Sequence, residues 1–230
     1  MISCSFDSFS IYNINNNEYK VVQTLNYHTH CVNQIIELNN KKLVSCSDDK
    51  SIIFYNEENG EYKKEYFIQT NGNNLKVIQT KDKEICYGEF IGKGKVNIHF
   101  FNFFEQKTIT TIDNISITGY IHDNFLMITK DILLITGNNK LSLINIDKYN
   151  LIRVIDISDS GNIFSACMLN KDMLITGDEK GRIIQWKIEG DNLKFISKKE
   201  NAHDNWITTF SKIGNGHILS GSADEFIKIW

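Results

Sequence analysis

Short segments in which apolar and polar residues alternate run along the whole chain, separated by turns rich in Asn, Asp, Lys and Gly. This period of two is typical of β-strands, and no segment shows the apolar spacing of a long helix. One order recurs: an apolar strand, a second strand that ends in Ser or Thr plus a small residue, a third that ends in an aromatic residue, and a more polar fourth. The pattern predicts an all-β fold of four-stranded antiparallel units.

The end of the second strand marks an internal repeat of about 44 residues. The small residue at this point follows Ser, Thr or Tyr, and it recurs as Cys4, Cys46, Gly88, Gly137, Gly177 and Gly221. Four short antiparallel strands in a repeat of this length form one blade of a β-propeller.

The repeat predicts a single domain over residues 1–230 that contains six blade units. Their expected bounds are 1–25, 28–70, 74–112, 115–157, 162–198 and 203–230. The end units have room for three strands each and the others for four, which gives about five and a half blades. Because two three-stranded end units do not merge into one blade, we expect an incomplete or open ring. The unit 115–157 permits more than one strand assignment.

The last repeat carries the clearest motif. Its residues are His203, Trp206, Ile207, then Leu219-Ser220-Gly221-Ser222-Ala223-Asp224, then Ile227-Lys228-Ile229-Trp230. In these positions the chain resembles the WD40 repeat family, and the resemblance extends over nearly all 230 residues. It implies a buried, hydrogen-bonded tetrad of a loop His, a strand Ser or Thr, a turn Asp and a strand Trp. The matching residues are His203, Ser220, Asp224 and Trp230.

A second repeat matches the tetrad less closely. By position its members are His28, Ser45, Asp49 and Tyr55, with Tyr in place of Trp. The other repeats depart further, because Lys140 and Lys180 occupy the Asp position, no loop His precedes Ile163, and the Trp-Asp dipeptide occurs nowhere. We expect those units to be held by packing instead.

The resemblance also implies a protein-binding top face built from loops and strand starts. With a period of two, the residues beside the buried Val32, Ile163 and Ile207 point away from the core. These residues are Cys31, Asn33, Asn162, Phe164, Trp206 and Thr208. Phe164 and Trp206 are the expected apolar anchors. The alternative for Trp206 is packing against the neighbouring blade.

Composition narrows the function further. A net charge of -3 and a pI of about 6.1 argue against a chain-wide footprint for nucleic acid or anionic lipid. No apolar stretch is long enough for a transmembrane helix, and the first residues lack the features of a secretory signal. Five cysteines without a CxxC motif fit reduced thiols, so we expect a cytoplasmic or nuclear protein.

The candidate chemical motifs are weak. The cluster 28–31 holds two histidines and a cysteine but has no second pair at metal-ligand spacing, and His99, His122 and His217 are isolated strand or turn residues. The stretch 92–95 (Gly-Lys-Gly-Lys) lacks the Walker spacing and precedes a strand, so it predicts a hairpin turn. We therefore expect no cofactor, no metal and no catalytic residues.

Together these features favour a non-catalytic scaffold or adaptor that binds other proteins. This step rests on family analogy, because fold alone does not determine function. Two alternatives remain open: a segment of a larger multidomain protein whose activity lies outside this chain, and a propeller enzyme with a site in its central channel.

Overall fold

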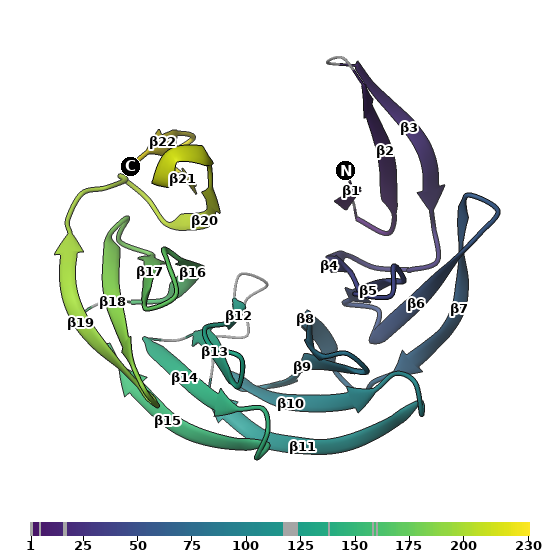
Figure 1. The fold of residues 1–230 in the computed structure, drawn as a ribbon, viewed down its shortest axis with the longest axis horizontal. Helices are drawn as coiled ribbons and strands as arrows, with labels where there is room; N and C mark the ends of the chain where they lie inside the picture. The colour runs from purple at the N-terminus through teal and green to yellow at the C-terminus, as the bar shows by residue number, and fades with distance from the viewer. Residues whose placement is uncertain are drawn as a thin grey trace. The chain divides into compact units, whose positions relative to one another are not determined.

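The protein is seen in a computed structural model that describes residues 2–4, 6–15, 18–116, 124–137, 139–157, 159 and 161–230. These residues form 22 β-strands and one short 3₁₀ turn, η1 (Gly214–Gly216) (Figure 1). Pairing within the six sheets is antiparallel throughout. The chain divides into two compact units, Met1–Asp113 and Asn114–Trp230.

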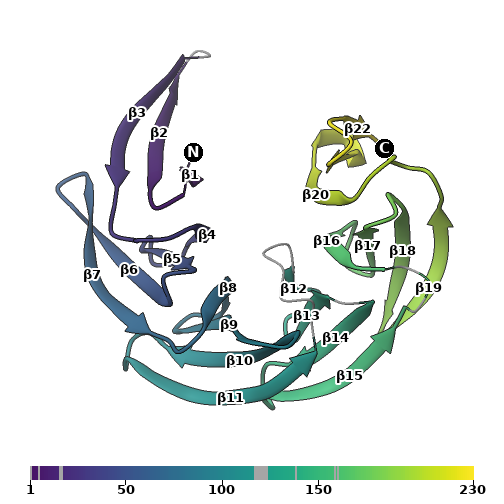
Figure 2. The same cartoon turned by 180° about the vertical axis from the view of Figure 1, so that it is seen from behind.

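The first unit contains three sheets, whose strand orders can be followed from both sides in Figures 1 and 2. The first sheet, β1-β2-β3, has the bounds Ile2–Cys4, Phe9–Asn15 and Glu18–Leu25. The second, β4-β5-β6-β7, has the bounds Val32–Glu37, Leu43–Ser47, Ser51–Glu58 and Glu61–Gln69. The third, β8-β9-β10-β11, has the bounds Asn73–Lys81, Glu84–Gly92, Lys95–Asn102 and Lys107–Ser116.

The second unit contains the other three sheets. The fourth sheet, β12-β13-β14-β15, has the bounds Phe125–Met127, Ile132–Gly137, Lys140–Asn145 and Asn150–Asp156. The fifth, β16-β17-β18-β19, has the bounds Ile163–Met168, Met173–Asp178, Ile183–Glu189 and Asn192–Lys199. The sixth, β20-β21-β22, has the bounds Ile207–Lys212, Ile218–Ser222 and Ile227–Ile229.

The all-β class, the four-stranded blades and the two three-stranded end sheets are confirmed. The single domain over residues 1–230 and the incomplete ring stay predictions. Within the blades, burial follows strand position: every residue of β5 and β13 is buried, whereas most residues of β7 and β15 are not. This gradient explains why the second strand of each repeat is apolar and the fourth is polar.

Core side chains join neighbouring sheets within each unit. In the first unit the rings of Phe54 and Tyr66 stack 4.4 Å apart and pack with Val77 and Tyr87 of the next sheet. In the second unit Leu141 and Leu143 cluster with side chains of the fifth sheet. The sheets therefore share apolar cores between their faces, as propeller blades do.

The Gly-Lys-Gly-Lys stretch forms the turn between β9 and β10. Lys93 and Gly94 connect the paired residues Gly92 and Lys95, and both have positive φ, 54° and 67°. Two central residues with positive φ form the hairpin turn that matches the twist of a β-ribbon. The stretch is thus a hairpin turn.

Candidate functional site

A β-bulge lies near the start of the inner strand in the second, fifth and sixth sheets. The pairing register shifts between Val32 and Gln34, between Ile163 and Ser165, and between Ile207 and Thr209. The extra residues are Asn33, Phe164 and Thr208. A bulge re-aims the side chain that it carries, and bulges are common beside functional sites. Three of the six residues expected on the binding surface are therefore bulge residues.

Two aromatic side chains of the second unit meet at this level. The ring centroids of Phe164 and Trp206 lie 5.3 Å apart at an interplanar angle of 39°. Trp206 is 40% exposed and Phe164 only 5%. The loop backbone also fixes Trp206, because its N–H donates to Asn205 Oδ1 and its carbonyl accepts from the Ala223 N–H. Phe164 is thus a support behind an accessible Trp206, not a second exposed anchor.

The other expected surface residues are partly buried and hold turns. Asn33 Nδ2 donates to Asp48 Oδ1 and to the Asn74 carbonyl, both at 2.8 Å. The carbonyl groups of Cys31 and Asn162 accept from turn N–H groups. Thr208 Oγ1 donates to a strand carbonyl at 3.2 Å. Cys31 and Asn33 belong to the first unit and the other four residues to the second.

The four tetrad residues of the last repeat form a connected network. Trp230 Nε1 donates to Ser220 Oγ at 2.7 Å, and Ser220 Oγ lies 2.6 Å from His203 Nε2. His203 Nδ1 lies 2.7 Å from Asp224 Oδ2. Because indole only donates and carboxylate only accepts, all these contacts are met when Ser220 donates to Nε2 and the imidazole carries a proton on Nδ1. Every member is satisfied, so the network fixes the loop before β20.

The second repeat contains the same chain of contacts. Tyr55 Oη lies 2.9 Å from Ser45 Oγ, Ser45 Oγ lies 2.6 Å from His28 Nε2, and His28 Nδ1 lies 2.8 Å from Asp49 Oδ2. The hydroxyl of Ser51 adds a contact at 2.6 Å to the Asp49 carboxylate. The phenol of Tyr55 thus occupies the place that the indole of Trp230 occupies in the sixth sheet.

In the fifth sheet, ion pairs replace part of the tetrad and add to the packing expected there. Asp159 stands four residues before Ile163, where the other two repeats have His, and Lys180 occupies the Asp position. Lys180 Nζ donates to the Asp159 carbonyl at 2.8 Å. Arg182 Nε donates to the fully buried Asp178 at 2.7 Å, and its Nη2 donates to the Asp159 carbonyl at 2.6 Å.

The fifth sheet keeps the contact between the indole and the strand hydroxyl. Trp186 Nε1 donates to Thr176 Oγ1 at 3.0 Å. The loop and turn positions, His and Asp elsewhere, are here Asp and Lys. The network is therefore changed in chemistry but still connects the loop, the turn and the strands.

A different arrangement lies in the third sheet. Glu89 Oε1 accepts from the N–H groups of Asn71 and Gly72 at 2.6 and 2.7 Å. His99 Nε2 donates to Glu89 Oε2 at 2.9 Å, and His99 Nδ1 lies 2.9 Å from Thr111 Oγ1. The buried carboxylate is occupied by the loop before β8, so this network positions a loop.

The first prediction concerns the His203 network. His203→Ala leaves buried polar partners unsatisfied and is expected to lower the free energy of unfolding by about 1 to 3 kcal/mol. His217→Ala is the matched control, because His217 is exposed and its imidazole lies 3.3 Å from the Trp230 carbonyl. Urea denaturation of both variants measures the difference. Equal losses would show that the His203 contacts contribute no more than a surface histidine.

The His28 network makes stability depend on pH. Burial lowers the pKa of His28 from its ordinary 6.5, so the folded state favours neutral His28. Burial alone would raise the pKa of Asp49, but hydrogen bonds from Ser51, His28 and the Thr29 N–H hold it below 3.8. The His28 contribution is therefore complete above pH 6.5 and declines as the pH falls below that value. The Asp49 contribution declines only below about pH 4.

We expect the difference in Tm between the wild type and His28→Gln to shrink as the pH falls from 7 to 5. Thermal unfolding at several pH values checks this. A difference that stays constant over this range contradicts the assignment of a neutral His28.

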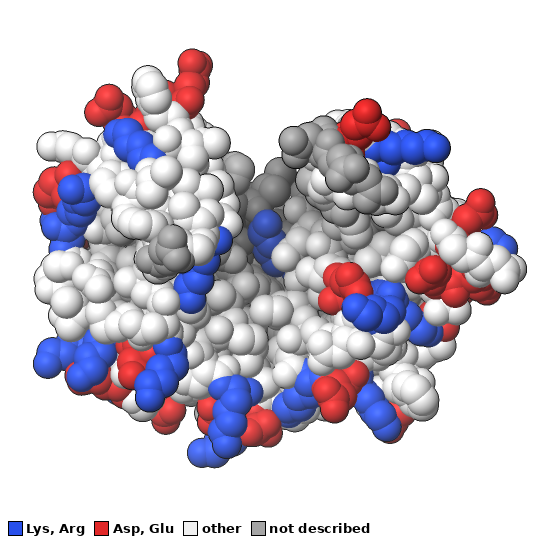
Figure 3. Space-filling model, turned by 45° about the horizontal axis from the view of Figure 1, so that its top comes forward, with Lys and Arg blue, Asp and Glu red and all other residues white. Residues whose placement is uncertain are grey.

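The described residues contain no group of three potential metal ligands and no helix long and apolar enough to cross a membrane. His122 lies outside them. All five cysteines are free thiols, and burial raises the pKa of Cys46 to about 12. On the face seen in Figure 3, Lys and Arg side chains are interspersed with Asp and Glu.

Comparison with known proteins agrees with these repeats. The family model "WD domain, G-beta repeat" matches residues 19–56 and 195–230, the two stretches that contain the His28 and His203 networks. ASTRA-associated protein 1 of Scheffersomyces stipitis is 39% identical over 69 residues, which is 30% of this chain. The match spans 15% of that protein.

Two solved structures share the fold. A chain in the crystal structure of the mitotic checkpoint complex has a TM-score of 0.78 at 13% identity, over 97% of this chain and 70% of that one. Saccharomyces cerevisiae Sqt1 has a TM-score of 0.76 at 12% identity, over 100% of this chain and 67% of that one. Residues 19–56 and 195–230 therefore match the WD40 repeat, and the chain shares its propeller fold with these structures.

Proposed function

We propose that this chain is a non-catalytic scaffold or adaptor that binds other proteins through the strand starts of its blades, with Trp206 as the main anchor. The observation that carries the proposal is the cluster of Trp206 and Phe164 described above. A large aromatic side chain that is accessible and rigidly supported loses little conformational entropy on binding, and such residues dominate protein interfaces.

Two further observations support this role. Asn205, next to Trp206, offers a polar side chain at the rim, and loops on a rigid scaffold are where binding residues concentrate. The name of ASTRA-associated protein 1 and the description of the mitotic checkpoint complex both place those proteins in assemblies. Such a role is consistent with this chain, because its described polar networks hold the loops and turns that would contact a partner.

The enzyme alternative requires reactive groups at the central channel. Hydroxyl, imidazole and carboxylate groups stand in line at three places among the described residues. In Ser220–His203–Asp224 and Ser45–His28–Asp49 the hydroxyl is buried and also bonded to Trp230 or Tyr55. The third line is Thr111–His99–Glu89. Both oxygens of Glu89 are already engaged, one by two loop N–H groups and one by His99. The line thus favours a structural role. A larger protein that includes this chain as one segment is compatible with the scaffold role.

Purification of the protein from cells, with its partners identified by mass spectrometry, supplies the ligand for the test. Hydrogen exchange of the purified pair then maps the contact. The proposal expects slower exchange around residues 161–165 and 203–208 when the partner is bound. Protection confined to other parts of the chain would contradict this choice of surface.

A further inference from the structure

Two turns of the second unit are fixed beside the loop that carries Trp206. The turn between β17 and β18 packs on this loop, because the His203 N–H donates to the Gly181 carbonyl at 2.9 Å. A Cβ on Gly181 would collide with the carbonyl groups of His203 and Asn205, so only glycine permits this approach. The turn between β21 and β22 is held by the Ala223 N–H, which donates to the Trp206 carbonyl at 3.0 Å. Both turns therefore have fixed positions next to the Trp206 loop.

Each of these three segments carries an exposed acidic side chain. The three residues are Glu179, Asp204 and Glu225. In the part of the chain that the structure describes, none of the three carboxylates forms an ion pair or accepts a hydrogen bond. Two of them belong to the segments that bring Phe164 and Trp206 together. Asp204 stands two residues before Trp206, and the Glu179 N–H donates at 2.9 Å to the Asn162 carbonyl, two residues before Phe164. These negative charges are available to a partner.

Four cations of the fifth and sixth sheets are, by contrast, engaged within the chain. Each contacts a carbonyl or carboxylate oxygen at 2.7 or 2.8 Å. They are Lys180, Arg182, Lys198 and Lys228. An incoming basic group therefore does not have to displace an internal cation from the exposed carboxylates. The charge that this surface offers to a partner is negative.

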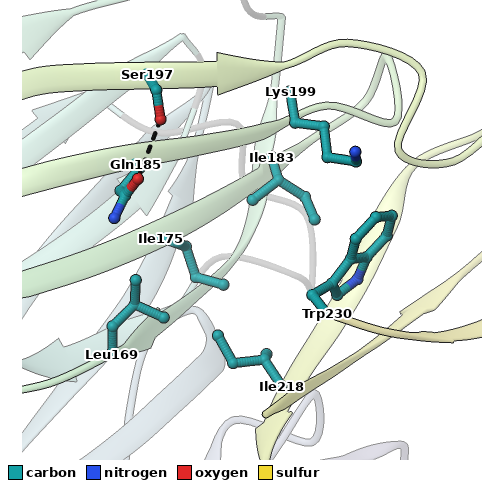
Figure 4. Close-up of a pocket in the computed structure, with 8 residues that line it drawn as sticks. All are labelled: Leu169, Ile175, Ile183, Gln185, Ser197, Lys199, Ile218 and Trp230. Atoms are coloured by element: carbon teal, nitrogen blue, oxygen red, sulfur yellow. Dashed lines mark hydrogen bonds between the residues drawn. The ribbon is translucent and has the colours of Figure 1, made fainter. Parts of the chain in front are cut away.

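The chain itself already pairs cations with aromatic faces. Lys199 Nζ lies 5.1 Å from the centre of the Trp230 ring (Figure 4), and Lys64 Nζ lies 4.3 Å from the centre of the Phe67 ring. The ring quadrupole attracts the cation, and indole gives the strongest attraction of the aromatic side chains. An accessible indole at Trp206, with exposed carboxylates on the adjoining segments, thus favours a cationic side chain over an apolar one.

We propose that the partner binds at Trp206 through a basic segment, in which an arginine stacks on the indole and the carboxylates of Glu179 and Asp204 pair with this and neighbouring arginines. This inference rests on the proposed function and adds to it the chemistry of the partner. Arginine fits better than lysine, because its planar guanidinium stacks on a ring and also donates several hydrogen bonds to carboxylates. A nucleic acid or an anionic membrane fits poorly, because its phosphates would face the carboxylates.

The probe is a short capped peptide of alternating arginine and glycine, and fluorescence anisotropy measures its binding to the full 230-residue chain. The same peptide with citrulline in place of arginine keeps the planar side chain but carries no charge, so it should bind about tenfold more weakly. A peptide with glutamate in place of arginine should not bind. Equal binding of the arginine and citrulline peptides, binding of the glutamate peptide, or no binding of the arginine peptide would overturn the proposal.

The double variant Glu179→Gln, Asp204→Asn tests the carboxylates, because it removes both charges with little change in shape. We expect it to bind the arginine peptide about tenfold more weakly. Asp172→Asn, Asp191→Asn is the matched control, since it changes the net charge equally but at the opposite end of the strands of the fifth sheet. The control should bind as the wild type does. Equal weakening by the two double variants would overturn the proposal, because long-range charge alone then explains the binding.

Trp206→Leu separates stacking from apolar anchoring, because leucine keeps an apolar surface but has no ring face. We expect Trp206→Leu to bind the arginine peptide about tenfold more weakly, whereas Trp206→Phe retains most of the binding. Unchanged binding by Trp206→Leu would contradict the stacked arginine.

The partner purified from cells distinguishes this inference from the scaffold proposal. We expect it to protect residues 203–208 from hydrogen exchange and to bind Glu179→Gln, Asp204→Asn more weakly than the wild type. Protection of these residues with equal binding to the double variant would overturn the basic segment and leave the scaffold proposal intact. A partner that protects only other parts of the chain would contradict the scaffold proposal, and this inference with it.

Discussion

Replacing Arg182 with Ala is expected to lower the free energy of unfolding by about 3 to 5 kcal/mol, the usual cost of removing one partner of a buried ion pair. The cause is Asp178, which is fully buried and whose carboxylate Oδ2 accepts from Arg182 Nε at 2.7 Å. Without the guanidinium, two turn N–H groups still bond to Oδ1. The negative charge itself has no remaining counter-charge among its hydrogen-bond partners. Urea denaturation gives the free energy directly.

Lys180→Ala is the matched control, since Lys180 belongs to the same network but its side chain is half exposed. Its loss should stay within about 1 kcal/mol. The double variant Asp178→Asn, Arg182→Met removes both charges and should recover part of the stability lost in Arg182→Ala. If Arg182→Ala and Lys180→Ala cost the same small amount, the buried pair is not what holds the turn of the fifth sheet.

The strands and both His tetrads could be predicted from the sequence because each depends on residue type at a fixed spacing. His28 and His203 each stand four residues before the first buried residue of an inner strand. The apolar second strands are evident because β5 and β13 bury both faces. In these places local pattern and tertiary packing favour the same structure, so the pattern alone is sufficient to predict the strands and the tetrads.

The ion-pair network of the fifth sheet has a signal in the sequence. Asp159 has the same offset from Ile163 that His28 has from Val32, and a carboxylate there calls for cations in the following turn. Arg182 Nη1 donates to the Asp159 carboxylate at 3.2 Å, and Lys180 Nζ lies 3.8 Å from it. The signal in the sequence is thus the residue that replaces each tetrad member, and not only the absence of the member.

The bulges and the Glu89 network could not be read from the sequence. A period of two predicts that Phe164 points outward, but the extra residue in β16 changes the register and Phe164 is buried behind Trp206. Glu89 binds the N–H groups of residues 71 and 72, which pairing of β8 with β9 brings close. Both features depend on the register of strand pairing, which hydrophobic alternation does not specify at a bulge.

Trp206→Ala is expected to weaken the direct binding of a purified partner by about 2 kcal/mol, or about 30-fold in Kd. The reason is the position of the indole, which is accessible on one side and supported by Phe164 on the other. Truncation removes the apolar contact with the partner and leaves the backbone hydrogen bonds of residue 206 in place, so the fold should persist. Titration calorimetry of the wild type and the variant measures the change.

Phe104→Ala is the control for a simple loss of exposed aromatic surface. Phe104 is more exposed than Trp206 and lies in the turn after β10, in the other unit. It should bind the partner as the wild type does. A sharp fall in the Tm of Trp206→Ala, with unchanged binding by the protein that remains folded, would show instead that the contact with Phe164 is the main role of Trp206. Because the two rings meet across the fifth and sixth sheets, unfolding and binding must be measured on the same preparation to separate these roles.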